Sequence, residues 1–468
     1  MAESAPAVLY LTRFYRPATA AAGLRADRFI NALRDRGLRV IVATVGEYPE
    51  LNDTGNNLIV CRIAPRGRLP GQIELEQTIP WRRSDPLPGP GSDAVCSKAI
   101  YRAGQWLVNR YRPELIFTTG LPFGWVAVGV RLAQETGLPL VAEFRDAWYT
   151  GIPWPYPSRG HRERARKWEQ ICLETAAKIV TETQTQKAIL DVAYPQYADK
   201  TVTIRHSYDP AIEPQNVIPT DRSSGSGPSF NLAYVGQVRG LDLVDVPPAK
   251  RGLREAYHFL SKTIRGASFC ENLRLDWMSP HYLMQALGQL VEENPDRNNL
   301  VKLTFVGQKL PEIDKWARKL NLSEQVRQLG PLPPEGAEKI IAQSDLLVLN
   351  LYGIKTLDYH WCVPGKTYTY LGSGKPILAL LPAGEARDLV RRAGVGFAVG
   401  PDDVAAIKNQ LEQLIRQHQQ GGIKIEPDFA FIRQFALPVQ QKQFADLITS
   451  VINRPVKKGS GAFSACAV

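Results

Sequence analysis

The sequence predicts an α/β protein made of two doubly wound, parallel-sheet domains in tandem. Short apolar segments alternate with helical patterns along most of the chain, and the alternation restarts after residue 229. The length of 468 residues also exceeds what one hydrophobic core usually fills. We therefore expect two domains that face each other across a cleft, lined by loops at the carboxyl ends of the strands.

The first domain is predicted to span residues 1–210. A strand at 8–12, a helix at 24–36 and a strand at 38–44 form a parallel βαβ unit. A helix is also expected just before Tyr194. Further strands are predicted at 115–119, 138–144, 178–181 and 201–205, with helices at 124–135 and 162–177.

A linker at 211–229, rich in Pro, Ser, Gly and Asn, precedes the second domain at 230–427. Residues 240–278 are predicted to be an insertion with a helix around 253–263, because so long a loop is unusual in this fold. Helical residues 428–455 are expected to return to the first domain, leaving a tail at 456–468. Within the second domain, strands are predicted at 230–236, 300–306, 326–329, 346–350 and 376–381, and helices at 281–292, 313–320, 336–342, 366–371 and 404–417.

Composition and charge restrict the class of protein. The hydrophobic content of 44% and charged content of 22% are typical of a soluble globular protein. The net charge of +11 comes partly from arginines in 62–83 and from basic residues in 158–168, beside Trp154, Tyr156 and Trp168. This mixture suits an anionic membrane surface, and a solvated helix face is the alternative. No nucleic-acid recognition motif accompanies the basic residues, so nucleic acid is not an expected partner.

Six scattered cysteines without a CxxC pair indicate a reducing compartment and no structural zinc. His360 and Cys362 lie close in sequence, but two candidate ligands do not make a metal site. The chain has no signal-peptide pattern and no apolar run of about 18 residues. We expect a cytoplasmic protein without a bound metal, acting at the inner face of the cell membrane if its basic surface binds lipid.

Residues 363–403 carry the strongest functional signal. Pro364 and Gly365 form a turn, Lys366 follows, and a short helix pattern closed by Gly374 leads into an apolar strand. A helix N-terminus presents unpaired backbone N–H groups, and the lysine beside it adds a positive charge. The combination suits a diphosphate, and an ordinary strand–helix repeat is the alternative.

Five segments in order carry a resemblance to a known family. They read YLTRFYRP with the following Gly23 turn, EFRDAW at 143–148, IVTETQ at 179–184, VTIRHSYDP at 202–210 and VPGKTYTYLGSGKPILAL at 363–380. Together they resemble the family 4 type retaining glycosyltransferases, in particular their bacterial polysaccharide and cell-envelope branch. The resemblance covers nearly the whole chain except the insertion, and implies the GT-B fold of two Rossmann-like domains.

The resemblance implies a nucleoside diphosphate sugar bound by the second domain and an acceptor held mainly by the first. Gly23 belongs to the family's opening loop, which approaches the donor phosphate. The base is expected against the loop that contains Gly330 and Leu332. No cofactor beyond this co-substrate is implied.

For the diphosphate, the resemblance implies backbone N–H groups and basic side chains. Lys366, beside Pro364 and Gly365, is the first candidate, and Arg239 after Gly236 is the second. Preorganised donors of this kind stabilise the charge that builds up on the leaving group without a metal.

The sequence departs from the family at three positions. The family usually has two glutamates spaced E-x7-E, one for the donor sugar and one for the ribose, and here Trp361 and Thr369 stand in their places. A threonine hydroxyl can bind a ribose, although a neutral hydrogen bond is worth roughly half a charge-assisted one. Trp361 can stack on a sugar or belong to the core. His206-Ser207 replaces the family's Asn-Gly turn.

Asp146 and His206 are the candidate catalytic residues. Asp146 follows a strand that points at the predicted cleft, where it can orient an acceptor hydroxyl or accept its proton. A salt bridge to Arg145 or a capping role is the alternative. His206 ends another strand and can contact the donor or the acceptor, and an ordinary loop histidine is the alternative.

The predicted activity is retaining transfer of a hexose or acetamidohexose from a nucleotide sugar to a polysaccharide precursor or lipid-linked glycan acceptor. Two other hypotheses stay open. One is a nucleotide-sugar epimerase, and the other is a non-catalytic nucleotide-sugar-binding or scaffold protein, which the loss of both glutamates motivates.

Overall fold

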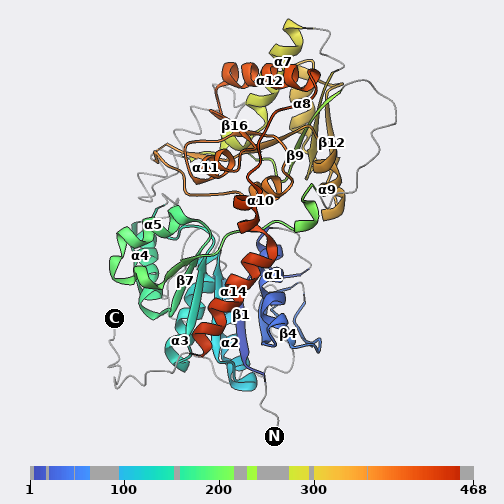
Figure 1. The fold of residues 1–468 in the computed structure, drawn as a ribbon. Coiled ribbons are helices and arrows are strands. Elements are labelled where there is room, and N and C mark those ends of the chain that lie inside the picture. The colour runs from blue at the N-terminus through green and yellow to red at the C-terminus, as the bar shows by residue number, and fades with distance from the viewer. Residues whose placement is uncertain are drawn as a thin grey trace.

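The computed structural model describes residues 5–16, 21–46, 48–63, 94–151, 159–214, 229–239, 273–294, 300–355 and 357–453. The described chain folds into two α/β domains. Figure 1 shows the first domain in the lower half and the second domain in the upper half. Most of the predicted linker and insertion, Trp154, Tyr156, the arginines of 64–93 and the tail lie outside the described residues.

The first domain is built on an eight-stranded sheet with the order β3-β4-β2-β1-β5-β6-β7-β8. All neighbouring strands are parallel except β3 and β4. The strands are β1 (Ala7–Leu11), β2 (Arg39–Val45), β3 (Glu50–Asp53), β4 (Leu58–Ile63), β5 (Leu115–Gly120), β6 (Leu140–Phe144), β7 (Lys178–Thr181) and β8 (Thr201–Thr203). The helices are α1 (Ala21–Asp35), α2 (Ala94–Tyr111), α3 (Phe123–Thr136), α4 (Arg159–Thr175) and α5 (Gln184–Ala193).

Helices cover both faces of this sheet, so both sides of its strands are buried and the strands are almost continuously apolar. Along β1, Leu9 and Leu11 pack into a core with residues of α2, α3 and α4, whereas Val8 and Tyr10 pack into a core with residues of α1. Alternate residues of a strand point to opposite faces, so every residue of β1 is buried.

The second domain has a six-stranded parallel sheet with the order β12-β11-β9-β13-β15-β16. Its strands are β9 (Phe230–Val235), β11 (Val301–Val306), β12 (Val326–Gly330), β13 (Leu346–Asn350), β15 (Ile377–Leu380) and β16 (Gly396–Val399), and a small antiparallel pair joins β10 (Leu273–Arg274) to β14 (Gly353–Ile354). Its helices are α7 (His281–Glu293), α8 (Pro311–Lys319), α9 (Pro334–Gln343), α10 (Gly365–Gly372), α11 (Glu385–Arg392) and α12 (Val404–Gln419). Residues of α7, α8 and α12 form the core on one face, and residues of α9, α10 and α11 the core on the other.

Each sheet has a point where the strand order reverses, between β1 and β5 in the first domain and between β9 and β13 in the second. Ligands of open α/β sheets bind outside the carboxyl ends of the strands at such points. The predicted fold class, two doubly wound parallel-sheet domains, is confirmed.

Two segments connect the domains and bond to each other. The backbone N–H of Tyr208 donates to the Phe435 carbonyl (3.2 Å), and the N–H of Leu437 donates to the Tyr208 carbonyl (2.8 Å). Beyond this crossing, α13 (Phe429–Ile432) and the 3₁₀ turn Arg433–Phe435 lead into α14 (Leu437–Ile452). Figure 1 shows α14, in red, lying along the first domain beside α1, where the Phe444 ring stacks on Phe29 with centroids 4.0 Å apart.

The described part of the chain contains no helix long and apolar enough to cross a membrane. Of the basic stretch in 158–168, Arg162, Arg164, Arg166 and Lys167 lie on α4. Trp168 on the same helix packs against the first core rather than standing free beside them.

Candidate active site

Lys366 lies at the reversal point of the second sheet. It follows Gly365 at the start of α10, and its Nζ is 3.3 Å from Asn350 Oδ1 at the end of β13. The same Nζ is 3.7 Å from the centroid of the Tyr234 ring on β9. Burial lowers the pKa of Lys366 to about 7. Both of these contacts are to neutral groups, so the amine sits where an anion would restore its charge.

Three glycines stand at the carboxyl ends of neighbouring strands in the second domain, and Gly236 is the one that lies beside Lys366. Gly236, Gly307 and Gly330 follow or end the neighbouring strands β9, β11 and β12, with φ of 132°, 147° and 86°. A Cβ on Gly307 would lie 2.3 Å from the Gly236 carbonyl oxygen, so no other residue fits there. A Cβ on Gly236 would lie 3.6 Å from Lys366 Cδ.

The other predicted donor-binding residues are spread along the same sheet edge and α10. Pro364 precedes the first turn of α10, and Thr369 lies one turn further along, half-buried. Leu332, in the loop after β12, is 37% exposed, as a residue that packs on a base would be. Arg239 is exposed, and its guanidinium donates a hydrogen bond to Gln237 Oε1 (2.8 Å). Their roles stay predictions.

Two expectations need correction. Gly23 does not form a turn: α1 begins at Ala21, so Gly23 lies in the first turn of the helix, because the apolar helix pattern starts earlier than its first leucine suggests. Trp361 is 1% exposed and belongs to the interior, so the stacking interpretation is wrong in this structure. The approach of Gly23 to the donor phosphate, which the resemblance implies, stays a prediction.

In the first domain, a buried arginine organises the facing edge. Arg25 of α1 contacts Glu143 of β6 through Nε (2.9 Å) and Nη2 (2.8 Å), and both residues are almost fully buried. Thr119 Oγ1 donates to the second carboxylate oxygen of Glu143 (2.6 Å). Arg25 also donates to the carbonyl oxygens of Ile204 and Arg205, each at 2.7 Å. A charge-assisted network thus fixes the residues that precede His206.

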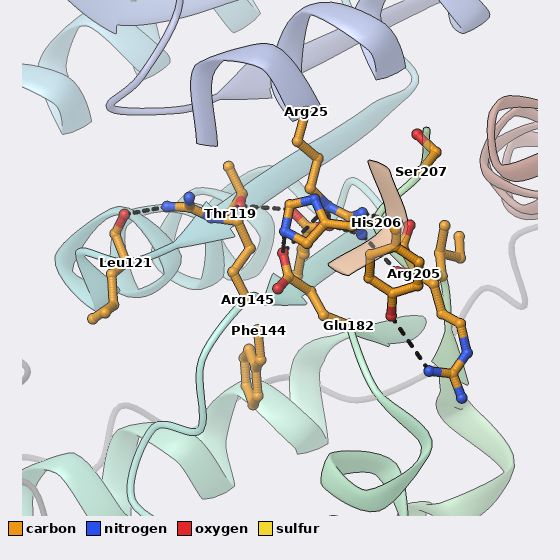
Figure 2. Close-up of polar contacts among 12 residues, drawn as sticks. Arg25, Thr119, Leu121, Phe144, Arg145, Glu182, Arg205, His206 and Ser207 are labelled. Atoms are coloured by element: carbon orange, nitrogen blue, oxygen red, sulfur yellow. Dashed lines mark hydrogen bonds and ion pairs between the residues drawn. The ribbon is translucent and has the colours of Figure 1, made fainter. Parts of the chain in front are cut away.

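His206 points at the second domain. A Cβ on Gly365 would lie 3.7 to 3.8 Å from the His206 ring atoms, so the imidazole packs against the N-terminus of α10. Its Nε2 is 3.1 Å from Glu182 Oε1, an ion pair when the ring is protonated (Figure 2). Burial raises the pKa of Glu182, but the charges of His206, Arg25 and Arg145 outweigh burial and lower it. Glu182 therefore stays a carboxylate.

Asp146 follows β6 and lies in the same electrostatic environment. Burial, and then the negative charge of Glu182, raises the pKa of Asp146 to about 6. Arg145 does not take the role of salt-bridge partner that the alternative gave it: its Nε donates to the Gly120 carbonyl (2.8 Å) and to Thr119 Oγ1 (3.1 Å). Asp146 therefore has no salt bridge to Arg145. With a pKa of about 6, its carboxylate can accept a proton near neutral pH.

Glu385 of α11 joins the two domains next to this site. Its carboxylate accepts hydrogen bonds from the backbone N–H groups of Gln184 (3.2 Å) and Thr185 (2.8 Å) at the start of α5. It also forms an ion pair with Arg205, whose guanidinium lies 3.5 Å from the Tyr368 hydroxyl of α10. A carboxylate from one domain thus caps a helix of the other.

Sequence reasoning missed several residues of this site. Arg25, Glu143, Glu182 and Arg205 are charged groups that the fold brings together from distant segments. Glu385, a visible helix-start carboxylate in the sequence, joins them from the second domain. Gly307 could have been predicted from the sequence, because it directly follows an apolar strand, as Gly236 does.

No metal site accompanies these residues in the described ranges, where no group of three or more His, Cys, Asp or Glu is arranged to hold an ion. His360 uses Nδ1 to accept a hydrogen bond from the backbone N–H of Cys362 (3.2 Å), and burial lowers the pKa of His360 to about 4. Cys61, Cys172 and Cys362 are free thiols.

Comparison with known families identifies the class of protein. Residues 20–204 match the model of the glycosyl transferase 4-like domain, and residues 268–417 match that of the glycosyl transferases group 1 domain. The two matches cover the two α/β domains in turn. The chain is therefore a glycosyltransferase of the GT-B type.

Solved structures share the fold over nearly the whole chain. HepE of Anabaena, in complex with UDP and glucose, has a TM-score of 0.58 at 16% identity, covering 95% of this chain and all (100%) of the other. A glycosyltransferase from Rickettsia africae gives 0.59 at 12% identity, covering 96% and 100%. WaaG, a glycosyltransferase involved in lipopolysaccharide biosynthesis, gives 0.55 at 15% identity, covering 94% and 99%. No protein among curated sequences matches this chain.

Proposed function

We propose that this glycosyltransferase moves a sugar from a nucleoside diphosphate sugar to a polysaccharide precursor or lipid-linked acceptor, with retention and without a metal. The observation that carries the proposal is Lys366. A half-buried amine with neutral neighbours stands at the reversal point of the second sheet, at the N-terminus of a helix, facing His206 of the first domain. This is the arrangement that binds a diphosphate.

The chemistry requires charge stabilisation at the leaving group. When the bond from the sugar's anomeric carbon to the phosphate oxygen breaks, its electron pair stays on the diphosphate. Lys366 and the first N–H groups of α10 are placed to stabilise that charge. The acceptor hydroxyl oxygen forms the new bond and releases its proton. Asp146, with its pKa raised to about 6, is the residue we assign to accept it.

The neighbours support the choice of donor and acceptor class. HepE is described in complex with UDP-glucose, and WaaG is described as acting in lipopolysaccharide biosynthesis. We extend a uridine diphosphate sugar donor and a cell-envelope glycan acceptor to this chain as part of the proposal. The exposed arginines of α4 are the surface we assign to the inner face of the membrane, in the cytoplasm.

The test is incubation of purified protein with a panel of radiolabelled nucleotide sugars, UDP-glucose and UDP-N-acetylglucosamine among them. We expect one donor to be hydrolysed slowly without an acceptor and transferred faster with a lipid extract. The variant Lys366→Met should lose this activity. The control Lys408→Met, which removes an ion pair between α12 and Glu293 of α7, should retain it. Absence of binding and hydrolysis for every donor at millimolar concentration would overturn the proposal.

A second candidate, a non-catalytic protein that binds the nucleotide sugar, is favoured by one observation. Trp361 is buried and Thr369 is uncharged, so neither carboxylate expected around the donor is present at these positions. If wild type and the Lys408→Met control both bind a donor but neither hydrolyses nor transfers it, this candidate is favoured.

A further inference from the structure

We propose that Glu182 is a positioning residue that holds the His206 imidazole against α10, so that His206 meets the diphosphate from the first domain. The inference rests on the proposed function, since it concerns the same nucleotide. It adds a second group to the diphosphate site, contributed across the domain interface.

The backbone around His206 is fixed from α1. Arg25 donates to the carbonyl oxygens of Ile204 and Arg205, both at 2.7 Å, and Arg28 donates to the carbonyl of Ser207 at 2.9 Å. Carbonyls on both sides of His206 are therefore held by buried or half-buried guanidinium groups. Little freedom is left for this turn, so the direction of the imidazole is set mainly by its own side-chain contact.

Glu182 supplies that contact. Its Oε1 lies 3.1 Å from His206 Nε2, and the two side chains are 11% and 14% exposed. Arg25 and Arg145 are the other cations near Glu182. Arg25 Nε is 3.5 Å from Glu182 but only 2.9 Å from Glu143, and Arg145 Nε donates to the Gly120 carbonyl and to Thr119 Oγ1. Because Glu143 already neutralises Arg25, the charge of Glu182 is directed mainly at His206.

Glu182 itself is held in place by its own loop. Its backbone N–H donates to Gln186 Oε1 (3.3 Å), and the next residue, Thr183, caps α5 through Oγ1. The carboxylate thus leaves a rigid helix start in the direction of His206, as the sticks in Figure 2 show.

When the ring is protonated and Nε2 pairs with Glu182, Nδ1–H is the ring donor left for a phosphate oxygen. The ring lies over Gly365, the residue that precedes Lys366 at the start of α10. A diphosphate seated on the α10 amides and Lys366 is therefore within reach of a group from each domain. Preorganised donors of this kind act without reorganisation as charge builds up on the leaving group.

The experiment measures binding of UDP, ADP, GDP and UMP to the full chain by isothermal titration calorimetry. We expect Glu182→Gln to weaken binding of the preferred diphosphate by about five- to tenfold, and binding of the matching monophosphate by less than about twofold. His206→Asn should show the same selective loss. The matched control Glu163→Gln, which removes an exposed ion pair to Arg166, should bind as wild type.

The double variant decides whether Glu182 acts through His206. If it does, Glu182→Gln combined with His206→Asn weakens diphosphate binding no more than His206→Asn alone. Additive losses, an unchanged affinity of Glu182→Gln, or equal losses for diphosphate and monophosphate would each overturn the inference. If wild type binds none of the nucleoside diphosphates, the proposed function fails; if it binds and Glu182→Gln binds equally well, this inference alone fails.

Discussion

The two edges of the site differ in how their charges are neutralised. In the first domain, Arg25 and Glu143 pair with each other in the interior, and their remaining polar atoms bind protein groups. In the second domain, Lys366 contacts a neutral amide and an aromatic ring, and burial lowers its pKa. The charges of the first edge neutralise each other, whereas the second edge has an amine with neutral neighbours, to which we assign the diphosphate.

The comparison predicts its largest effect on stability at the first edge. Glu143→Gln leaves the buried Arg25 guanidinium without its nearer counter-charge, with Glu182 3.5 Å away as the other carboxylate, and breaking a buried pair in this way costs about 3–5 kcal/mol of unfolding free energy. Urea denaturation followed by circular dichroism measures it. The control Glu50→Gln breaks the more exposed pair with Arg62 and should cost less than about 1 kcal/mol. A similar small cost for both variants would remove the contrast between the two edges.

At the second edge, Lys366→Met should affect ligand binding strongly and stability little. The free energy of unfolding is expected to stay the same or rise, because an amine whose charge is disfavoured by burial is removed. Affinity for UDP is expected to fall by about 10- to 100-fold, the value of a charge-assisted bond of roughly 1.5–3 kcal/mol. Urea denaturation measures the first and calorimetric titration with UDP the second, each beside the Lys408→Met control. Lost stability together with unchanged UDP affinity would assign Lys366 a structural role instead.

The lowered pKa of Lys366 predicts a pH dependence of binding. In the empty site the amine loses its proton as pH rises through about 7, and the diphosphate binds the charged form. Affinity for UDP should therefore fall above about pH 7, by up to about tenfold per pH unit, until the pKa of the bound state is reached. Lys366→Arg keeps its charge throughout this range and should show a flatter profile. Equal profiles for both proteins would show that another group governs binding.

The smallest expected effect is at Thr369 in α10, one turn beyond Lys366. Thr369→Glu restores the carboxylate that the family resemblance implies for the ribose, and a charge-assisted bond is about twice as strong as a neutral one. We expect a gain in UDP affinity of about two- to fivefold, with little change for the free diphosphate group, pyrophosphate. No gain for UDP would favour the non-catalytic candidate.

Local signals predicted the second edge well. Strand endings, a glycine turn and a lysine at a helix start are all visible within a few neighbouring residues. The structure has Lys366 at a helix start and Gly236 after a strand, as predicted, and their binding of the donor stays a prediction. The fold class followed from the strand–helix alternation. Gly307 carried the same signal and was overlooked. Gly23 was misplaced because a glycine near a helix start can lie in the helix as readily as before it.

The first edge could not be predicted in the same way. Arg25 and Glu143 are 118 residues apart, and nothing near either residue in the chain announces their pairing. Glu182, Arg205 and Glu385 likewise gain their roles only when two sheets and two domains are assembled. Trp361 shows the converse, because its position beside a glycine turn resembles a binding site and its burial becomes visible only in the packed structure.

A crystal structure of the full chain with UDP tests the central claim most directly. The account predicts phosphate oxygens within hydrogen-bond distance of Lys366 Nζ and the first N–H groups of α10, with the His206 imidazole approaching from the other domain. A UDP molecule whose phosphates lie away from the carboxyl ends of β9 and β13 would contradict it.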